Sequence, residues 1–183
     1  RPRRPAPGTS RAGLPWPSTV LVAALLACWR LPRHALYVLL TFSTYMRPSE
    51  LLALTVQQLV LPVAAAQGSA GKLSLVIHAE ELGISNKTGE MDLTVVLDLE
   101  RQQWLVPHLI ALAEGRQKDD SLFSLSYAKL ASEFKNAASN INVSVLEPTV
   151  YCLRHGGASH DIRTQSRDLR EVQSRGHWKA WSS

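Results

Sequence analysis

The sequence predicts an α+β fold, a mainly helical domain with a small three-stranded antiparallel sheet. Apolar residues recur at helical spacing in several segments on both sides of a central region. The central region contains two runs, 73–78 and 92–97, in which the side chains alternate as in half-buried strands. The 183 residues, 45% of them hydrophobic, are enough for one packed domain.

The first 17 residues are rich in proline and arginine and predict a flexible, extended linker. We therefore expect the packed domain to occupy residues 18–183. An apolar run at 20–29 follows basic residues, as in a signal peptide, but it is too short to span a bilayer. A buried helix is the favoured interpretation of that run.

Five helices and three strands are expected before the last forty residues. The helices run over 18–30, from Pro32 to about Thr44, from Arg47-Pro48 onward, over 102–115 and over 126–138. A shorter third strand is expected near 59–63. The side chains predicted to face inward are Leu36, Leu39, Leu40, Trp104, Leu105, Leu109, Leu112, Leu130 and Phe134.

One stretch near the end of the chain combines a helix start with an unusual set of side chains. Thr149 is placed as the N-cap residue, and Tyr151 and Arg154 share a face of the helix that follows. Gly156 and Gly157 remove bulk from the next turn, which indicates the close approach of another backbone or of a ligand.

A second short helix, 168–173, is expected to end at Gly176 as its C-cap, with His177 just beyond it. Far upstream, Arg47 stands at the start of another helix. Lys and Arg favour the opposite end of a helix, so an arginine at this position is electrostatically misplaced for an ordinary helix.

The C-terminal arrangement closely resembles the second half of the active site in the tyrosine recombinase (phage integrase) family. The family pattern is His-x-x-Arg-His, followed one helix later by Leu-Gly-His. Tyr151, Arg154 and His155 take the first three places, and Gly176 and His177 take the last pair. Tyr151 stands where the family usually has histidine or lysine.

The resemblance extends upstream to a second motif, Gly-x-Arg-x-Ser-Glu-Leu, whose arginine is the family's first catalytic one. Arg47, Ser49, Glu50 and Leu51 match this motif, while Tyr45 replaces the usual glycine. The resemblance therefore implies that Arg47 is catalytic and that Glu50 supports it.

A lysine is also expected from the resemblance, because the family places its catalytic lysine in the hairpin between the two long strands. The connection here contains Asn86-Lys87-Thr88-Gly89, which is rich in turn-forming residues. A lysine in such a loop is ordinarily solvated. The resemblance makes Lys87 the candidate and Lys72 the weaker rival.

The resemblance implies cleavage and rejoining of DNA strands through a 3′-phosphotyrosyl intermediate. Arg47 and Arg154 would clamp the phosphate, because guanidinium groups stay charged and pair bidentately with phosphate oxygens. His177 would add a hydrogen-bond donor, Lys87 would be the general acid, and His155 would support the others. No cofactor or metal is implied, and His155 and His160 do not share a helix face, so they make a poor metal pair.

The family's nucleophilic tyrosine follows the Gly-His pair by a short distance, which in this chain falls past Ser183. The domain is accordingly expected to be incomplete at its C-terminus, either as a fragment or as a degenerate copy. Two alternatives to an active recombinase stay open: an inactive DNA-binding relic of a mobile-element recombinase, and a type IB topoisomerase. The compact spacing of the motifs favours the recombinase.

The net charge of +5 is compatible with a polyanionic partner but does not identify one. The resemblance implies double-stranded DNA as partner, other recombinase protomers in a synaptic assembly, and no membrane. It also implies an intracellular location, in a nucleus or nucleoid. Cys28 and Cys152 are interpreted as reduced core residues rather than a disulfide pair.

Overall fold

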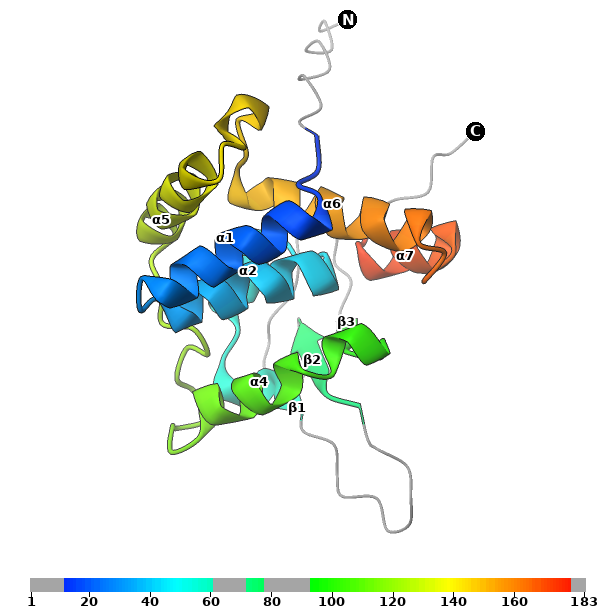
Figure 1. Cartoon of the computed structure of the whole chain (residues 1–183). Coiled ribbons are helices and arrows are strands. Elements are labelled where there is room, and N and C mark those ends of the chain that lie inside the picture. The colour runs from blue at the N-terminus through cyan, green and yellow to red at the C-terminus, as the bar shows by residue number, and fades with distance from the viewer. Residues whose placement is uncertain (1–11, 61–71, 78–92, 179–183) are drawn as a thin grey trace, which may run out of the picture.

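The computed structural model describes residues 12–60, 72–77 and 93–178, and within them it has the predicted α+β architecture (Figure 1). The helices are α1 Trp16–Cys28, α2 Pro32–Thr44, α3 Pro48–Ala53, α4 Leu105–Ala113, α5 Tyr127–Asn140, α6 Val150–Arg163 and α7 Leu169–Arg175. In the described ranges, short 3-10 turns lie at Val56–Gln58, Glu100–Gln102 and Ser144–Leu146. The predicted mainly helical fold is confirmed.

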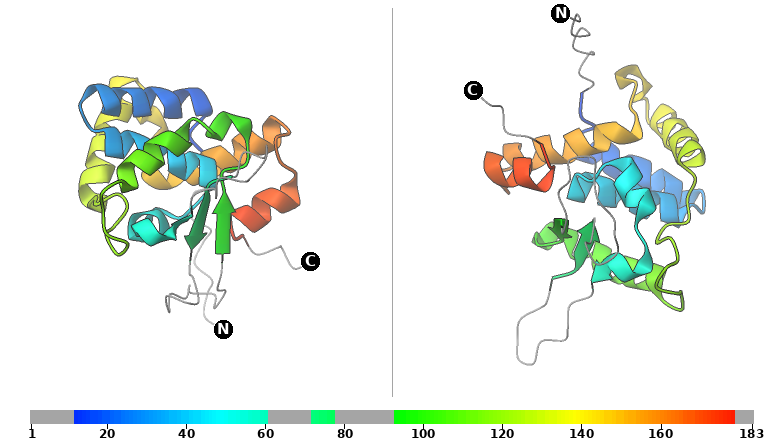
Figure 2. Two further views of the ribbon diagram at one scale, coloured as in Figure 1. Left: turned by 90° about the horizontal axis from the view of Figure 1, so that it is seen from below. Right: turned by 180° about the vertical axis from the view of Figure 1, so that it is seen from behind.

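The sheet has three antiparallel strands, β1 Leu59–Val60, β2 Ser74–Ile77 and β3 Leu93–Val96, in the order β1-β2-β3. Leu75 is the centre of the register, since it pairs with Leu59 on one side and with Val95 on the other. Leu75 and Ile77 are buried, as the alternating pattern predicts. In the left view of Figure 2, α7 lies next to β3.

Helix α2 is the centre of the helical layer. Every residue from 34 to 44 is buried, because α1 packs along one side of α2 and α6 crosses another (Figure 1). The sequence pattern predicts only a one-sided buried stripe at Leu36, Leu39 and Leu40. Those three are buried, but a helix with apolar residues around its whole circumference is buried on all sides.

The start of the packed chain differs from the prediction. Helix α1 begins at Trp16 rather than at Ser18, and Pro17 fits its first turn, where a missing N–H costs nothing. Leu14 is only 1% exposed, and its backbone N–H donates a hydrogen bond to the carbonyl of Cys152 at 3.2 Å. The last residues of the expected linker are therefore part of the domain, whereas residues 1–11 lie outside the described ranges.

Two predicted burials are wrong. Trp104 is 46% exposed, because α4 begins only at Leu105 and turns Leu105 and Leu109 inward instead. Cys28 is exposed at the end of α1, while Cys152 is buried as expected, and both are free thiols.

The glycine pair of α6 is a point of backbone contact, as predicted. A Cβ on Gly156 would lie 2.1 Å from the carbonyl oxygen of Leu14. A Cβ on Gly157 would lie 1.8 Å from the carbonyl oxygen of Phe42 in α2. Both distances are far below van der Waals contact, so these two glycines set how closely α6 approaches the helical layer and thereby where its other side chains lie.

Candidate functional site

Arg154 on α6 joins two segments that are far apart in the sequence. Its Nη1 donates a hydrogen bond to the backbone carbonyl of Tyr45 at 2.7 Å, and its Nη2 donates to the carbonyl of Gly176. The side chain is 1% exposed, so these bonds form in a low-dielectric environment where they are strong. One guanidinium thus fixes the end of α2, two residues before Arg47, against the end of α7, one residue before His177.

Trp178 covers Arg154. The guanidinium carbon lies 4.6 Å from the centre of the indole ring, within the range of a cation–π interaction. Burial lowers the pKa of Arg154, and the positive charge of Arg47 acts in the same direction. The Nε of Arg154 is buried and has no hydrogen-bond partner in the described part of the chain.

Arg47 occupies the N-cap position of α3. Its backbone N–H donates to Oε2 of Glu50 at 2.7 Å, and its Nη1 lies 2.5 Å from Oε1 of the same carboxylate. Glu50 therefore caps the helix and offsets the misplaced cation. The Arg47 side chain is 39% exposed, so the pair contributes only about 0.2–1 kcal/mol to stability.

Tyr45 takes a left-handed backbone conformation, with φ of 58°, at the position where the family usually has glycine. Its side chain is fully buried, and its hydroxyl donates a hydrogen bond to Oδ2 of Asp161 on α6. Its ring stacks near Trp178 with 6.3 Å between centroids. Burial raises the pKa of Tyr45 well above its ordinary value, and the hydrogen bond to Asp161 raises it further.

Asp161 belongs to a network of ionic side chains beneath the predicted site. Arg101 donates to Oδ1 of Asp161, and Nε of Arg167 lies 3.5 Å from Oδ2. Arg167 also forms a bidentate pair with Asp98. Arg175 lies 3.8 Å from the same carboxylate. Burial lowers the pKa of Arg175 to about 10, with a further contribution from the charge of Arg167.

The end of α7 differs from the expected glycine cap. Asp168 is the N-cap of the helix, and its side chain accepts from the backbone N–H of Glu171 at 2.8 Å. Gly176, however, has φ of −85°, while His177 has φ of 50°. The left-handed residue is therefore the histidine, and its conformation directs the chain from α7 toward Trp178.

Tyr151 and His155 form the outer edge of the group. Tyr151 is 43% exposed, and its ring lies edge-on to His155 at 5.1 Å. His155 in turn stacks on Trp178 with 6.0 Å between centroids. Burial lowers the pKa of His155, and the charge of Arg154 lowers it further. The rings run from exposed Tyr151 inward to buried Tyr45.

The structure brings Arg154 into contact with the segments that carry Arg47 and His177, and it places His155 and Tyr151 beside them. Lys87 lies outside the described residues, whereas Lys72 is described and exposed. Sequence reasoning missed Trp178 and Asp161. The one sequence feature that pointed to them is Tyr45, a bulky residue in place of the family's glycine, because its side chain contacts both Asp161 and Trp178.

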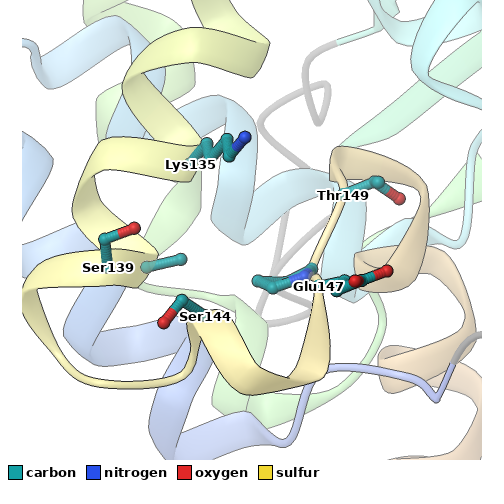
Figure 3. A pocket seen from close by; sticks show the side chains of 7 residues that line it. Lys135, Ser139, Ser144, Glu147 and Thr149 are labelled. Atoms are coloured by element: carbon teal, nitrogen blue, oxygen red, sulfur yellow. The ribbon is translucent and has the colours of Figure 1, made fainter.

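The described residues also line cavities away from this group. One, of about 300 Å³, lies between α5 and the start of α6, and Figure 3 shows Lys135 extending from α5 toward the segment of Glu147 and Thr149. Another, of about 590 Å³, is lined mainly by apolar side chains of α1, α2 and α4, together with Trp104 just before α4. Neither is lined by the predicted site residues.

The described part of the chain has neither a metal-binding cluster nor a membrane-spanning helix. Within those ranges, no three or more His, Cys, Asp or Glu side chains are grouped so that they could hold a metal ion. None of the helices found there has the length and apolar character needed to cross a bilayer.

The structure resembles known proteins, whereas the sequence does not match any family model or curated protein. No protein-family model matches the sequence, and no curated protein sequence matches it either. The structure is similar to that of XerA recombinase, with a TM-score of 0.65 and 18% identity over 96% of this chain and 58% of that one. It is also similar to XerH site-specific recombinase bound to difH substrate, with a TM-score of 0.67 and 17% identity over 92% of this chain and 48% of that one.

These similarities show that the chain has a tyrosine recombinase-like fold, as the sequence motifs predict. The chain spans 58% and 48% of the length of the two solved structures. At 18% and 17% identity, the likeness is one of fold.

Proposed function

We propose that this domain binds double-stranded DNA and acts in site-specific recombination, with Arg47, Arg154 and His177 around the phosphate that is cut. The observation that carries the proposal is the pair of hydrogen bonds from Arg154 to the carbonyls of Tyr45 and Gly176. They hold the Arg47 and His177 segments against one cation, so that the two sequence motifs form a single site.

The donor capacity of Arg154 fits this role. A guanidinium has five N–H donors in one plane, and the two carbonyl bonds leave three of them, including the unpartnered Nε–H. Trp178 covers a face of the guanidinium, whereas hydrogen bonds to a phosphate are made in its plane. Local movement that opens this edge would let a phosphate bind.

The reaction we propose is transesterification at phosphorus. The hydroxyl oxygen of a nucleophilic tyrosine gives up its proton to solvent and forms a bond to phosphorus. The bond from phosphorus to the 5′ oxygen breaks, and the 3′ phosphate stays on the tyrosine. The arginines and His177 stabilise the charge on the non-bridging oxygens, which is where most of the rate enhancement arises in phosphoryl transfer. Lys87 is proposed to give its proton to the leaving 5′ oxygen, and Tyr151 to donate a hydrogen bond at the edge of the site.

None of the four tyrosines in the sequence is assigned as the nucleophile. Tyr37 and Tyr45 are fully buried, and burial raises the pKa of each hydroxyl well above its ordinary value. Tyr127 lies on α5, and Tyr151 occupies the place of a proton-transfer residue in the family motif.

The XerH structure is described as a complex with its difH substrate before cleavage, which supports DNA as the partner proposed for this chain. A basic sequence with pI near 9.5 is compatible with that partner. We further propose that several copies assemble on DNA and that the protein acts where genomic DNA is present.

The test is duplex DNA binding, measured by fluorescence anisotropy over a series of salt concentrations. We expect affinity to fall steeply with salt because bound cations release counterions from the DNA. Arg47→Ala should weaken binding and lower the slope of log K against log salt by about 1, as removal of one phosphate contact does.

Arg33→Ala is the matched control. Arg33 is also exposed and also flanks a proline, but it lies at the other end of α2, about 18 Å along the helix from Tyr45. It should leave the slope unchanged. Equal effects of the two substitutions, or binding that does not respond to salt, would contradict the proposal.

A further inference from the structure

We infer that Tyr45 is a positioning residue. Through its contacts with α6 and with the end of α7, it fixes the position of Arg47 relative to Arg154 and His177. This inference rests on the proposed function, because it concerns the same phosphate site. It assigns a role to a residue that stands where the family motif has glycine and that touches no substrate in the proposed reaction.

Three segments meet at this one residue. Its own backbone leads within two residues to Arg47, and its carbonyl accepts from Nη1 of Arg154 at 2.7 Å. Its hydroxyl donates to Asp161, two turns after Arg154 on the same helix. Its ring contacts the end of α7, where the Arg175 guanidinium lies 5.7 Å from the ring centre and Trp178 stacks at 6.3 Å.

The backbone conformation of Tyr45 indicates that these contacts determine it. A φ of 58° is uncommon for any residue other than glycine, and it is more so for a bulky aromatic one. Such conformations persist where the surrounding structure fixes them. Here the fixing contacts are those to α6 and α7, because the side chain is fully buried between them.

Asp161 connects the Tyr45 hydroxyl to the ionic network. Its Oδ1 accepts from Arg101, and its Oδ2 accepts from Tyr45, with Nε of Arg167 at 3.5 Å. Asp161 is fully buried, and a buried carboxylate needs a donor for each oxygen. Without the hydroxyl, Oδ2 would keep only a long contact to Arg167, so α6 would shift or admit water at this point.

The first experiment is a double-mutant cycle in duplex DNA affinity, with wild type, Tyr45→Phe, Arg47→Ala and the double variant. Phenylalanine keeps the ring and removes the hydroxyl, so the fold is retained. We expect Tyr45→Phe to weaken binding by about twofold or more, the lower range of coupling within one network. In the Arg47→Ala background the same substitution should have a smaller effect, because the part of the effect that acts through Arg47 is already lost.

Thr41→Val is the matched control. It removes another fully buried hydroxyl from α2, one turn earlier, whose hydrogen bond goes to the carbonyl of Tyr37 within the helix. All variants are compared at a temperature at which each is folded. Thr41→Val should leave DNA affinity unchanged, because a loss of stability alone does not move Arg47.

The second experiment needs no DNA. His155 stacks on Trp178, which also stacks near Tyr45, so removal of the tyrosine ring should loosen the indole and open His155 to solvent. In Tyr45→Leu, an NMR titration should show the pKa of His155 shifted upward, toward the ordinary value of about 6.5. Thr41→Val should leave the titration of His155 as in wild type.

The outcomes separate the two claims. An unshifted His155 titration in folded Tyr45→Leu overturns the positioning role, as does a Tyr45→Phe effect that persists undiminished without Arg47. If Arg47→Ala leaves DNA affinity intact, the proposed function fails, and the His155 titration still decides whether Tyr45 positions this segment.

Discussion

Gly157 on α6 lies directly against the carbonyl of Phe42 on α2. A Cβ on Gly157 would lie 1.8 Å from the oxygen of that carbonyl and 3.0 Å from Cδ1 of Tyr45. The contact is between two backbones, so it fixes the separation of the helices where Arg154 reaches across to the Tyr45 carbonyl. The hydrogen bond from Arg154 to the Tyr45 carbonyl therefore depends on the lack of a side chain at Gly157, one turn further along α6.

Gly157→Ala should destabilise the protein. Alanine in a helix interior is favoured over glycine by about 1 kcal/mol, but backbone displacement in a packed core costs about 1–3 kcal/mol or more. We expect the free energy of unfolding, measured with urea, to fall by about 2 kcal/mol. Ser159→Ala, at an exposed position of the same helix, is the control and should change it by no more than about 0.5 kcal/mol.

Arg154→Ala should also cost stability, apart from any role in DNA binding. The substitution leaves the buried carbonyls of Tyr45 and Gly176 without their donor and opens a cavity beside Trp178. With about 1–3 kcal/mol for each unsatisfied buried acceptor, we expect a loss of about 3 kcal/mol in urea unfolding. Arg163→Ala, an exposed arginine on the same helix, should cost about 0.5 kcal/mol or less. Equal losses for the two arginines would contradict the bonding described for Arg154.

The fold was predictable to the extent that local patterns determine it. The alternation around Leu75 and the helical spacing of Leu130 and Phe134 identified elements whose hydrogen bonds are local or whose faces are clearly amphipathic. The prediction that Trp104 is buried was wrong, because helical periodicity does not determine the residue at which a helix begins. A start at Leu105 moves the preceding residue out of the helix.

The site was predictable in its residue types and less so in its contacts. The spacing of Gly156 and Gly157 indicated a close approach without identifying Leu14 and Phe42 as the partners. The burial of Asp161 could not be read from its position, because it depends on Arg101 and Arg167, which come from other segments. Long-range ionic networks leave no periodic trace in a sequence.

The burial of His34 predicts that the protein loses stability in mild acid. It is 4% exposed on α2, and its Nε2 has no hydrogen-bond partner among the described residues. Burial lowers the pKa of His34, and the charge of Lys129 lowers it further, while Glu133 opposes the shift. The unfolded chain therefore binds a proton more readily than the folded one, and stability falls as the pH drops below about 6.5.

The measurement is the free energy of unfolding at pH 7.5 and at pH 5.5. His34→Leu should show a smaller decrease between the two than wild type. Lys129→Met should reduce the decrease and Glu133→Gln should increase it, because they remove charges of opposite effect on His34. A decrease that is the same in all four proteins would exclude His34 as its source. His155 and His160 have pKa values lowered by burial as well, so part of the decrease should remain in His34→Leu.

Asp98 should control stability at a lower pH. Burial raises the pKa of this carboxyl, but the hydrogen bonds and charge of Arg167, together with Arg175, outweigh that effect and hold the pKa below its ordinary value. A depressed carboxyl pKa contributes stability that is present above about pH 4 and is lost as the pH falls through the folded-state value.

Asp98→Asn should therefore cost about 1–2 kcal/mol at pH 7, because hydrogen bonds to charged groups are lost and two nearby guanidinium groups are left uncompensated. The gap between variant and wild type should narrow in urea titrations as the pH falls below about 4, as the wild-type carboxylate becomes protonated. Asp119→Asn, an exposed carboxylate that accepts from Gln57 at 3.0 Å, is the control and should cost no more than about 0.5 kcal/mol at pH 7. A gap for Asp98→Asn that stays constant down to pH 2 would mean that the aspartate contributes through packing, so that the ionic network beneath Arg154 would not depend on its charge.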